Sequence, residues 1–362
     1  MLKGKTVAVV VPAYNEETQI DMVIETMPEF VDRIIIVNDC SKDKTAEKVK
    51  SYLGRLPKAS IPDVEKIKSN LYNRAEIILE EINKKELDYF AAADIITGEK
   101  DEKIVLINLL KNSGVGGAIA RGYKWAKDNL IDCTAVMAGD GQMDPGELES
   151  ICLPVIEENI DYVKGNRLSH KSAAFLIPKK RFIGNSILSI LTKVASGYWS
   201  VSDTQTGYTA ISLHALQSIK LYNIYPRYGM PNDMLVKLNI ASCTLKEIPI
   251  KPIYNVGEQS KMKVRKIVLP IIWLLKRSFF KRIWTKYLIR DFHPLFILYH
   301  FAFLLIGVSI PYGIKIITVA VSGIDLNPLT AMAFMFLFIS GFQALLFAMW
   351  MDIQNNDKLY KN

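Results

Sequence analysis

Two patterns of hydrophobic residues divide the chain. In the first 260 residues, short apolar runs such as Thr6–Pro12 and Arg33–Asp39 alternate with mixed segments such as Glu17–Phe30. Continuous apolar runs of this length predict parallel strands buried on both faces, and the mixed segments predict helices. Further strands are predicted at 103–109, 134–137 and 162–164, and further helices at 117–129 and 145–158. The first part of the chain is therefore predicted to be an α/β domain with a mostly parallel sheet.

The last part of the chain has a different pattern. Leu295–Val321 and Leu329–Met351 are apolar, and each exceeds the ~20 residues that cross a bilayer as a helix. Between residues 294 and 351 the only charged side chains are Lys315 and Asp325. We therefore expect a two-helix transmembrane hairpin over 294–351, followed by a tail over 352–362.

Positive charge gathers just before these apolar stretches. Gln259–Arg290 contains ten Lys or Arg residues and no acidic residue, whereas the formal net charge of all 362 residues is +8. Trp273, Phe280 and Trp284 interleave with these bases, a composition typical of helices in the lipid headgroup layer. We predict basic amphipathic interfacial helices over 259–293 that contact an anionic lipid membrane. A solvated linker helix stays open as an alternative, and nucleic acid is disfavoured as a partner because the run adjoins a membrane hairpin.

The same charges predict an orientation. Lys and Arg concentrate on the cytoplasmic side of membrane hairpins, and the short turn between the two apolar stretches contains neither. No signal peptide opens the sequence. We therefore expect an integral membrane protein whose residues 1–258 and C-terminal tail are cytoplasmic.

Polar residues at the predicted strand ends are the first candidates for chemistry, because α/β sheets bind ligands beyond the carboxyl ends of their strands. They are Asn15, Glu16, Asn38, Asp39 and Asp140. No P-loop motif is present, and neither the cysteines nor the histidines have the spacing of a zinc site. Carboxylates at strand ends suit a divalent cation that holds a diphosphate.

Seven motifs strengthen this interpretation. They are VVVPAYNEE (Val9–Glu17), IIIVNDCSKDKT (Ile34–Thr45), GVGGAIARGY (Gly114–Tyr123), VMAGDGQMDPGEL (Val136–Leu148), GNRL (Gly165–Leu168), SDTQTGYTAIS (Ser202–Ser212) and GEQSKM (Gly257–Met262). In this order they resemble the family 2 glycosyltransferases of GT-A fold, in particular the dolichol-phosphate and polyprenyl-phosphate sugar synthases with two C-terminal transmembrane helices. The resemblance implies inverting transfer of one sugar from a nucleotide diphosphate sugar to a polyprenyl or dolichyl phosphate.

The resemblance also implies site residues. It assigns nucleotide contacts to Pro12, Ala13, Tyr14, Glu16, Asp39 and Lys261, metal ligands to Asp140 and Gln142, and catalytic positions to Asp140, Arg167, Arg181 and Asp203. Ala138 replaces the first Asp of the family's metal motif, so Mg²⁺ or Mn²⁺ is expected to be held mainly through substrate phosphates. The planar guanidinium groups of Arg167 and Arg181 suit the acceptor phosphate, because arginine can donate two parallel hydrogen bonds to phosphate.

Other interpretations of these residues stay open. Asp39 would also suit a helix cap, and Arg181 would also suit lipid headgroups. Asp203 would also suit a positioning contact to Arg181 or a helix cap. Asp233 is the candidate base if the acceptor is instead a lipid or sugar hydroxyl.

Residues 54–103 form a charged insertion relative to the resembling chains, with an amphipathic helix predicted at Asn73–Phe90. The insertion suits a partner surface, a lid or decoration, and a homo-oligomer is possible. A UDP-hexose or UDP-N-acetylhexosamine donor is favoured over GDP-mannose. A membrane-tethered scaffold that has lost catalysis is the non-enzyme alternative, since Ala138 permits it.

Overall fold

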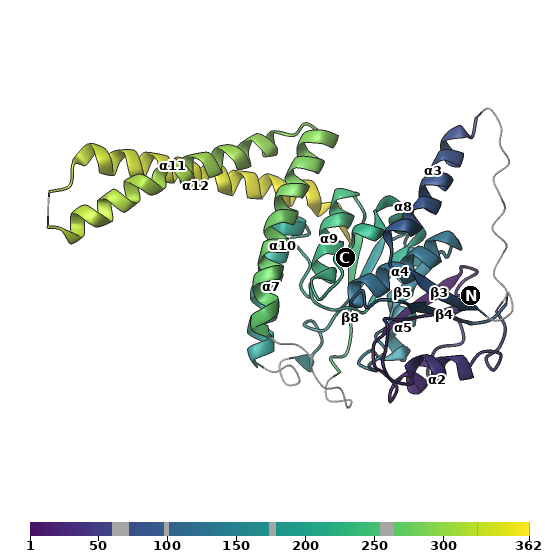
Figure 1. The fold of residues 1–362 in the computed structure, drawn as a ribbon. Helices are drawn as coiled ribbons and strands as arrows, with labels where there is room; N and C mark the ends of the chain where they lie inside the picture. The colour runs from purple at the N-terminus through teal and green to yellow at the C-terminus, as the bar shows by residue number, and fades with distance from the viewer. Residues whose placement is uncertain (60–71, 98–100, 174–178, 254–263, 324, 362) are drawn as a thin grey trace.

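The sheet at the centre of the molecule follows the predicted α/β pattern. The structure is a computed structural model and describes residues 1–59, 72–97, 101–173, 179–253, 264–323 and 325–361. Within these residues, nine strands form one sheet in the order β3-β4-β2-β1-β5-β7-β6-β8-β9 (Figure 1). They are β1 (Val7–Ala13), β2 (Arg33–Asn38), β3 (Ala93–Thr97), β4 (Ile104–Leu109), β5 (Cys133–Val136), β6 (Tyr162–Asn166), β7 (Thr209–Ser212), β8 (Leu245–Pro249) and β9 (Tyr360–Lys361).

Most neighbouring strands are parallel, as predicted. β1 pairs in parallel with β2 and β5, β2 with β4, and β8 with β6 and β9. β3 and β7 run antiparallel to their neighbours. The hydrophobic pattern does not predict β3, β7, β8 or β9, because these strands are short and several of their residues are polar or half-exposed.

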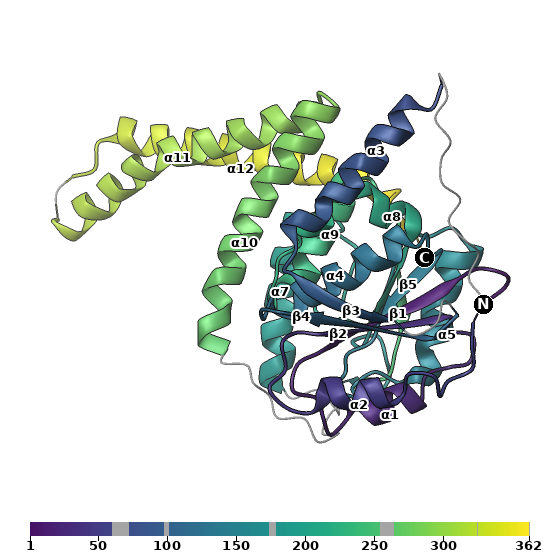
Figure 2. The same ribbon diagram turned by 45° about the vertical axis from the view of Figure 1, so that its right-hand side comes forward.

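Helices cover both faces of the sheet (Figure 2). On one face α1 (Ile20–Glu25), α2 (Thr45–Ser51) and α5 (Leu148–Glu157) pack on residues such as Val9, and on the other α4 (Val115–Asp128), α8 (Leu213–Ser218) and α9 (Met230–Ile240) pack on residues such as Val10. Successive residues of a strand point to opposite faces. The apolar runs are continuous because both faces are buried.

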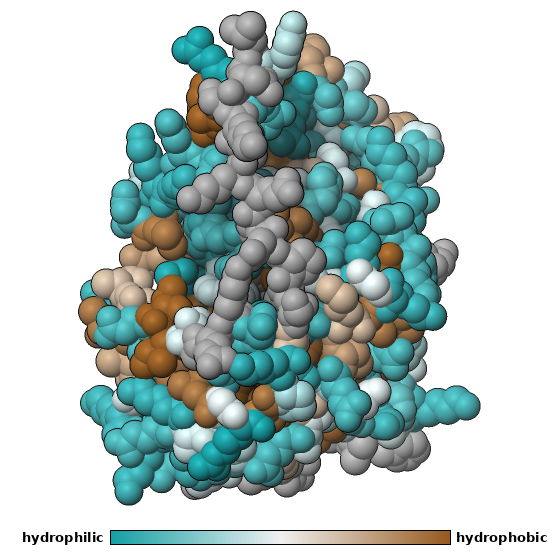
Figure 3. All heavy atoms as spheres, turned by 90° about the vertical axis from the view of Figure 1, so that its right-hand side faces the viewer, coloured by the Kyte–Doolittle hydropathy of each residue, from teal (hydrophilic) through white to brown (hydrophobic). Residues whose placement is uncertain are grey.

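A helical part continues from this domain. α7 (Lys179–Ser196) and α10 (Val264–Trp284) lie side by side, and the π-helical turn η4 (Thr285–Arg290) leads into α11 (Pro294–Val321) and α12 (Pro328–Asp357). α11 and α12 pack on each other and project away from the sheet (Figure 1). Both are long and apolar enough to cross a membrane, with a mean hydropathy of 2.0. The face of the molecule opposite them is mainly hydrophilic (Figure 3).

The insertion contains the predicted helix. α3 (Arg74–Lys85) and the 3₁₀ turn η1 (Glu86–Tyr89) match the expected amphipathic segment, and β3 then pairs with β4 at the edge of the sheet. α3 stands out from the domain (Figures 1 and 2).

The segment expected as a tail belongs to the fold. α12 runs on to Asp357, and Tyr360–Lys361 form strand β9 beside β8. The last described residues therefore return to the sheet after the hairpin, which corrects the expectation of a separate tail over 352–362.

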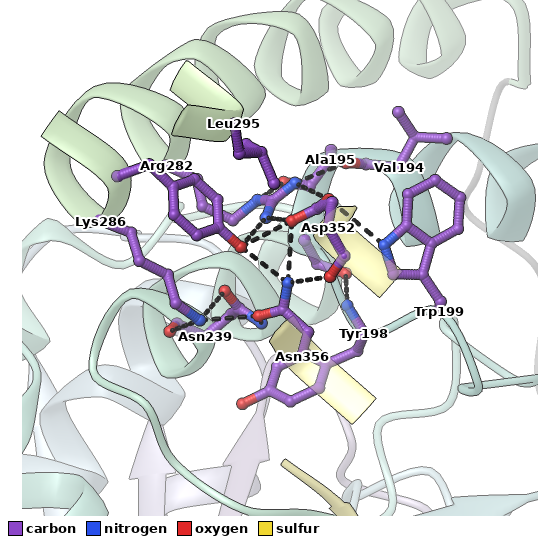
Figure 4. A network of polar contacts seen from close by, with 12 residues as sticks. Val194, Ala195, Tyr198, Trp199, Asn239, Arg282, Lys286, Leu295, Asp352 and Asn356 are labelled. Atoms are coloured by element: carbon purple, nitrogen blue, oxygen red, sulfur yellow. Dashed lines mark hydrogen bonds and ion pairs between the residues drawn. The ribbon is translucent and has the colours of Figure 1, made fainter. Parts of the chain in front are cut away.

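A buried polar network joins the hairpin to the domain (Figure 4). The Arg282 guanidinium, at the end of α10, donates to Asp352 Oδ1 at 2.7 Å and to Asp352 Oδ2 at 2.8 Å, and both side chains are fully buried. Lys286 Nζ donates to Asn239 Oδ1 at 2.9 Å and to Asn356 Oδ1 at 2.7 Å. Two of the ten bases expected to face lipid phosphate therefore bind the protein instead, since Asp352 and Asn356 lie one turn apart on α12 and face them.

Candidate active site

The residues predicted for the site gather at one edge of the sheet. β1, β2 and β5 are parallel, and β6 has the same direction because two antiparallel pairings through β7 separate it from β5. The carboxyl ends of these four strands therefore meet at one edge, where β7 begins. Pro12 and Ala13 end β1, Tyr14 and Glu16 follow it, Asp39 follows β2, Asp140 and Gln142 follow β5, Arg167 follows β6, and Asp203 precedes β7.

The loops after β1 and β2 form one surface. Asn15, which has a positive φ of 55°, donates from its backbone N to Ser41 Oγ at 3.0 Å, and its Oδ1 accepts from the backbone N of Lys42 at 2.9 Å. Glu16 N donates to Thr45 Oγ1 at 3.0 Å. Tyr14 is 36% exposed beside these contacts, so solvent reaches its side chain at this edge.

The loop after β5 lies against the same surface. A Cβ placed on Gly139 would be 3.3 Å from the carbonyl oxygen of Pro12 and 3.6 Å from Cγ of Glu16. Asp140 and Gln142 are both partly exposed, and Gln142 N donates to Asp140 Oδ1 at 3.1 Å. The candidate nucleotide residues and the candidate metal ligands are therefore close neighbours.

The oxygens of Asp140 and Gln142 fit a hard divalent cation. Among the described residues, no cluster of three or more His, Cys, Asp or Glu side chains is arranged to hold a metal ion. A cation here would take its remaining oxygen ligands from a diphosphate and water, as the loss of one Asp at Ala138 leads us to expect.

Asp39 turns onto the start of α4. Its Oδ1 accepts a hydrogen bond from Ser113 N at 2.5 Å, and its Oδ2 accepts one from Gly114 N at 2.8 Å. Burial raises the pKa of this carboxyl, and the two backbone hydrogen bonds only partly offset the effect. These two N–H groups belong to Ser113 and to Gly114, the N-cap residue of α4, so Asp39 fixes the loop that leads into α4 and is not itself an N-cap residue. The nucleotide contact stays a prediction.

The glycine cluster at 114–117 serves packing. Gly114 has a φ of +75°, and a Cβ on Gly116 would lie 2.1 Å from the carbonyl oxygen of Tyr225. Gly116 N donates to Pro226 O at 2.9 Å. The start of α4 therefore approaches the loop before α9 closely, which only glycine allows.

Arg167 and Asp203 form a bidentate ion pair. Arg167 Nε donates to Asp203 Oδ2 at 2.8 Å, and its Nη2 donates to Asp203 Oδ1 at 3.1 Å. The Asp203 side chain is 2% exposed and that of Arg167 is 24% exposed. Burial alone would raise the pKa of Asp203, but the hydrogen bond and charge of Arg167 hold it below its usual value. Asp203 therefore positions Arg167. The expected contact between Asp203 and Arg181 involves a side chain outside the described residues.

Glu247 on β8 supports this pair and was not predicted. Its Oε2 accepts from Ser202 N at 2.9 Å, and its Oε1 accepts from Asp203 N at 3.0 Å. The buried Lys164 lies in the same cluster, and burial lowers its pKa to about 8. The only sign of Glu247 in the sequence is its position as a charged residue between the apolar Leu245 and Ile248. The hydrophobic pattern did not predict the strand β8 that contains it.

Three other candidate residues are not shown to face the site: Lys261, Arg181 and Asp233. Lys261 and the side chain of Arg181 lie outside the described residues, although Arg181 falls in the first turn of α7. Asp233 Oδ2 accepts from Tyr225 N at 2.8 Å and pairs with Lys237. Its carboxylate is therefore occupied in holding the loop before α9.

The chain has recognisable relatives. The sequence profile of glycosyl transferase family 2 matches residues 8–70 and 64–220. A UDP-N-acetylglucosamine–dolichyl-phosphate N-acetylglucosaminyltransferase of Methanococcus voltae is 28% identical over 255 residues, which are 70% of this chain and 88% of the relative. A dolichyl-phosphate beta-glucosyltransferase of Trichomonas vaginalis is 25% identical over 303 residues, 79% of this chain and 76% of the relative.

Solved structures are more distant. Glucosyl-3-phosphoglycerate synthase from Mycobacterium tuberculosis, in complex with Mn²⁺, UDP and phosphoglyceric acid, aligns with a TM-score of 0.48 and 15% identity, covering 77% of this chain and 78% of that chain.

Proposed function

Since the chain belongs to glycosyl transferase family 2, we propose that it transfers a single sugar from a nucleotide diphosphate sugar to a polyprenyl or dolichyl phosphate at a membrane surface. The two curated relatives above act on dolichyl phosphate by their names, one of them from a UDP-sugar. We favour UDP-glucose or UDP-N-acetylglucosamine as the donor, with GDP-mannose as the other candidate.

One observation carries the proposal for a phosphate acceptor. The Arg167–Asp203 pair lies at the same sheet edge as the Asp140 loop, and two contacts link these loops. Tyr208 Oη donates to Asp144 O at 2.9 Å, and a Cβ on Gly207 would be 3.5 Å from Cε of Met143. A partly exposed, pre-oriented guanidinium beside the donor loops suits a second phosphate.

Asp140 and Gln142 would hold Mg²⁺ or Mn²⁺, which would supply Lewis-acid stabilisation of the charge on the leaving diphosphate. The residues of the chain then have separate tasks. Tyr14 packs on the base, and the loop after β2 that contains Asp39 contacts the nucleotide. Arg167 orients the acceptor phosphate.

The acceptor phosphate is already anionic near neutral pH and attacks the anomeric carbon without a general base. Positioning and charge stabilisation account for catalysis, and attack opposite the leaving group inverts the anomeric centre. The contacts of Asp233 disfavour the alternative with a hydroxyl acceptor, because its carboxylate accepts from Tyr225 N and Lys237.

We further propose that α11 and α12 span the membrane and that the domain is cytoplasmic. The exposed bases Lys276, Arg277 and Lys281 on α10, beside the exposed Trp273, support contact with anionic lipid.

The test is a donor screen. Full-length protein in detergent is incubated with a polyprenyl phosphate, Mg²⁺ or Mn²⁺, and radiolabelled UDP-glucose, UDP-N-acetylglucosamine or GDP-mannose. Formation of a lipid-linked sugar from one donor supports the proposal, and no product from any donor contradicts it.

Asp140→Asn is the informative variant in this assay. Loss of charge stabilisation at the leaving group should lower kcat by about 100-fold or more. Asp325→Asn, in the exposed turn between α11 and α12, is the matched control and should keep normal activity. Normal turnover in Asp140→Asn would remove Asp140 from the mechanism.

A further inference from the structure

A cavity lies beside the active-site edge, where the insertion meets α4. It has a volume of about 200 Å³, and Tyr89, Phe90, Ser113, Arg121, Tyr222 and Pro226 are among its lining residues. Its walls come from four places in the sequence: the end of the insertion, the end of β4, the start of α4 with the residue Ser113 before it, and the segment before α9. The insertion is therefore part of the wall.

Arg121 is the unusual residue of this cavity. It is 8% exposed, yet within the described residues its guanidinium has neither a hydrogen bond nor an ion pair. Its Cζ lies 5.9 Å from the centroid of the Phe90 ring. Burial lowers its pKa, and the charge of Asp128 only partly offsets this, but an arginine still keeps its proton.

The other buried arginines in the described part of the chain are satisfied. Arg282 uses all its N–H groups on Asp352, Tyr287 and two backbone carbonyls. Arg33 donates to the carbonyl oxygens of Asp32 and Ala59. Arg121 differs, because none of its nitrogens is both fully enclosed and without a partner, and the residue lines the cavity. Its guanidinium has no acceptor within the described residues, so it can bind an oxyanion that enters the cavity.

The remaining walls define the body of that ligand. Tyr89 and Tyr222 stack with ring centroids 4.7 Å apart, and Leu109 and Ile224 add apolar surface. A cavity of about 150 Å³ is enough for benzene, so this one has room for an aromatic ring and an oxyanion. We propose that the cavity binds a small molecule that carries a phosphate or carboxylate group on a compact aromatic body.

The site is placed to influence the active-site edge. Ser113 lines the cavity, and its backbone N donates to Asp39. A ligand that shifts Ser113 changes the position of the Asp39 carboxylate. Binding itself does not depend on the sugar-transfer proposal, so the two fail separately.

The test is calorimetric titration of the detergent-purified full chain with phenyl phosphate, benzoate and inorganic phosphate. Phenyl phosphate or benzoate should bind the unaltered protein and Arg74→Gln, an exposed arginine on α3, with equal affinity. Arg121→Gln should weaken binding about tenfold or more, because a charged hydrogen-bond partner is lost. Ala91 also lines the cavity. Ala91→Leu narrows the cavity and keeps the charge of Arg121, so it should weaken binding as well and covers the case in which Arg121→Gln does not fold.

Further arms separate this cavity from the active site. Binding should persist in Arg167→Lys and in the presence of saturating UDP or GDP. Displacement by either nucleotide, loss in Arg167→Lys, equal binding to all variants, or no binding of the aromatic probes would each overturn the proposal. Inorganic phosphate should bind more weakly than phenyl phosphate, and the opposite order would contradict the aromatic body.

Discussion

Two arginine–aspartate pairs in this protein are both bidentate, but they have different surroundings. Arg282–Asp352 joins α10 to α12 with both side chains at 0% exposure, whereas Arg167–Asp203 has a 24% exposed arginine. All N–H groups of Arg282 are bound within the protein, including bonds to Val194 O and Ala195 O. A guanidinium that is fully enclosed can bind no substrate, and one that is partly exposed at the sheet edge can.

The surroundings of an ion pair distinguish a structural pair from a functional one. Bidentate geometry and a buried carboxylate are common to both pairs, so neither property identifies a site. Two other properties distinguish the pairs: the exposure of the arginine and the identity of the residues around it. The Arg282 pair is surrounded by Tyr287 and Asn356 of the junction, and the Arg167 pair by loops at the carboxyl ends of the strands.

The largest effect is expected at the junction. Asp352→Asn leaves the Arg282 charge buried without a counter-charge and should lower the free energy of unfolding by about 3–5 kcal/mol. Denaturant unfolding in detergent measures this. Asp325→Asn, in the exposed turn between α11 and α12, is the control and should change stability by less than about 0.5 kcal/mol. Equal stability of the two variants would show that the buried pair does not hold the hairpin.

A smaller effect is expected from Glu247. In Glu247→Gln only one oxygen remains for the backbone N–H groups of Ser202 and Asp203, so Arg167 is positioned less well. The KM for polyprenyl phosphate should rise about tenfold, and the KM for the nucleotide sugar should stay unchanged. Glu158→Gln, which breaks the exposed pair with Lys246, is the control. A fall in thermal stability with both KM values unchanged would reduce Glu247 to a purely structural residue.

The smallest effect concerns pH at the junction. Burial, with the nearby charge of Arg282, lowers the pKa of Lys286 to about 7 from the usual 10.5. The unfolded chain therefore holds this proton between about pH 7 and 10 while the folded chain does not, so Lys286 makes stability rise with pH in this range. The increase in thermal midpoint from pH 7 to 9 should be smaller in Lys286→Met. The same increase in both proteins would mean that Lys286 keeps its proton when folded.

The sequence predicted the parts of the fold that follow from simple periodicity. Continuous apolar runs gave the central strands, and the expectations of a GT-A α/β domain and of two apolar C-terminal helices are confirmed. The return of Tyr360–Lys361 to the sheet was missed, because two residues carry no pattern and the pairing with β8 is long-range.

The site was predicted unevenly for a physical reason. Asp39, Asp140 and Arg167 stand in motifs or at strand ends, where the sequence signal is local. Glu247 acts through backbone groups that are more than 40 residues away in sequence, and Arg282 finds its partner in a helix 70 residues later. Such contacts depend on tertiary packing. The interpretation of every base in 259–290 as lipid-facing was wrong for Arg282 and Lys286 for the same reason.

We expect the Arg167 pair to bind the acceptor phosphate and the Arg282 pair to hold the structure together. The direct measurement is the KM for polyprenyl phosphate, with thermal midpoints, in Arg167→Lys and Arg282→Lys, using the donor found in the screen. Arg167→Lys loses the bidentate fork and should raise this KM about tenfold with a midpoint within about 2 °C of the unaltered protein. Arg282→Lys should lower the midpoint strongly and leave the KM of the folded protein unchanged. An unchanged acceptor KM in Arg167→Lys, with a midpoint as low as that of Arg282→Lys, would contradict the account.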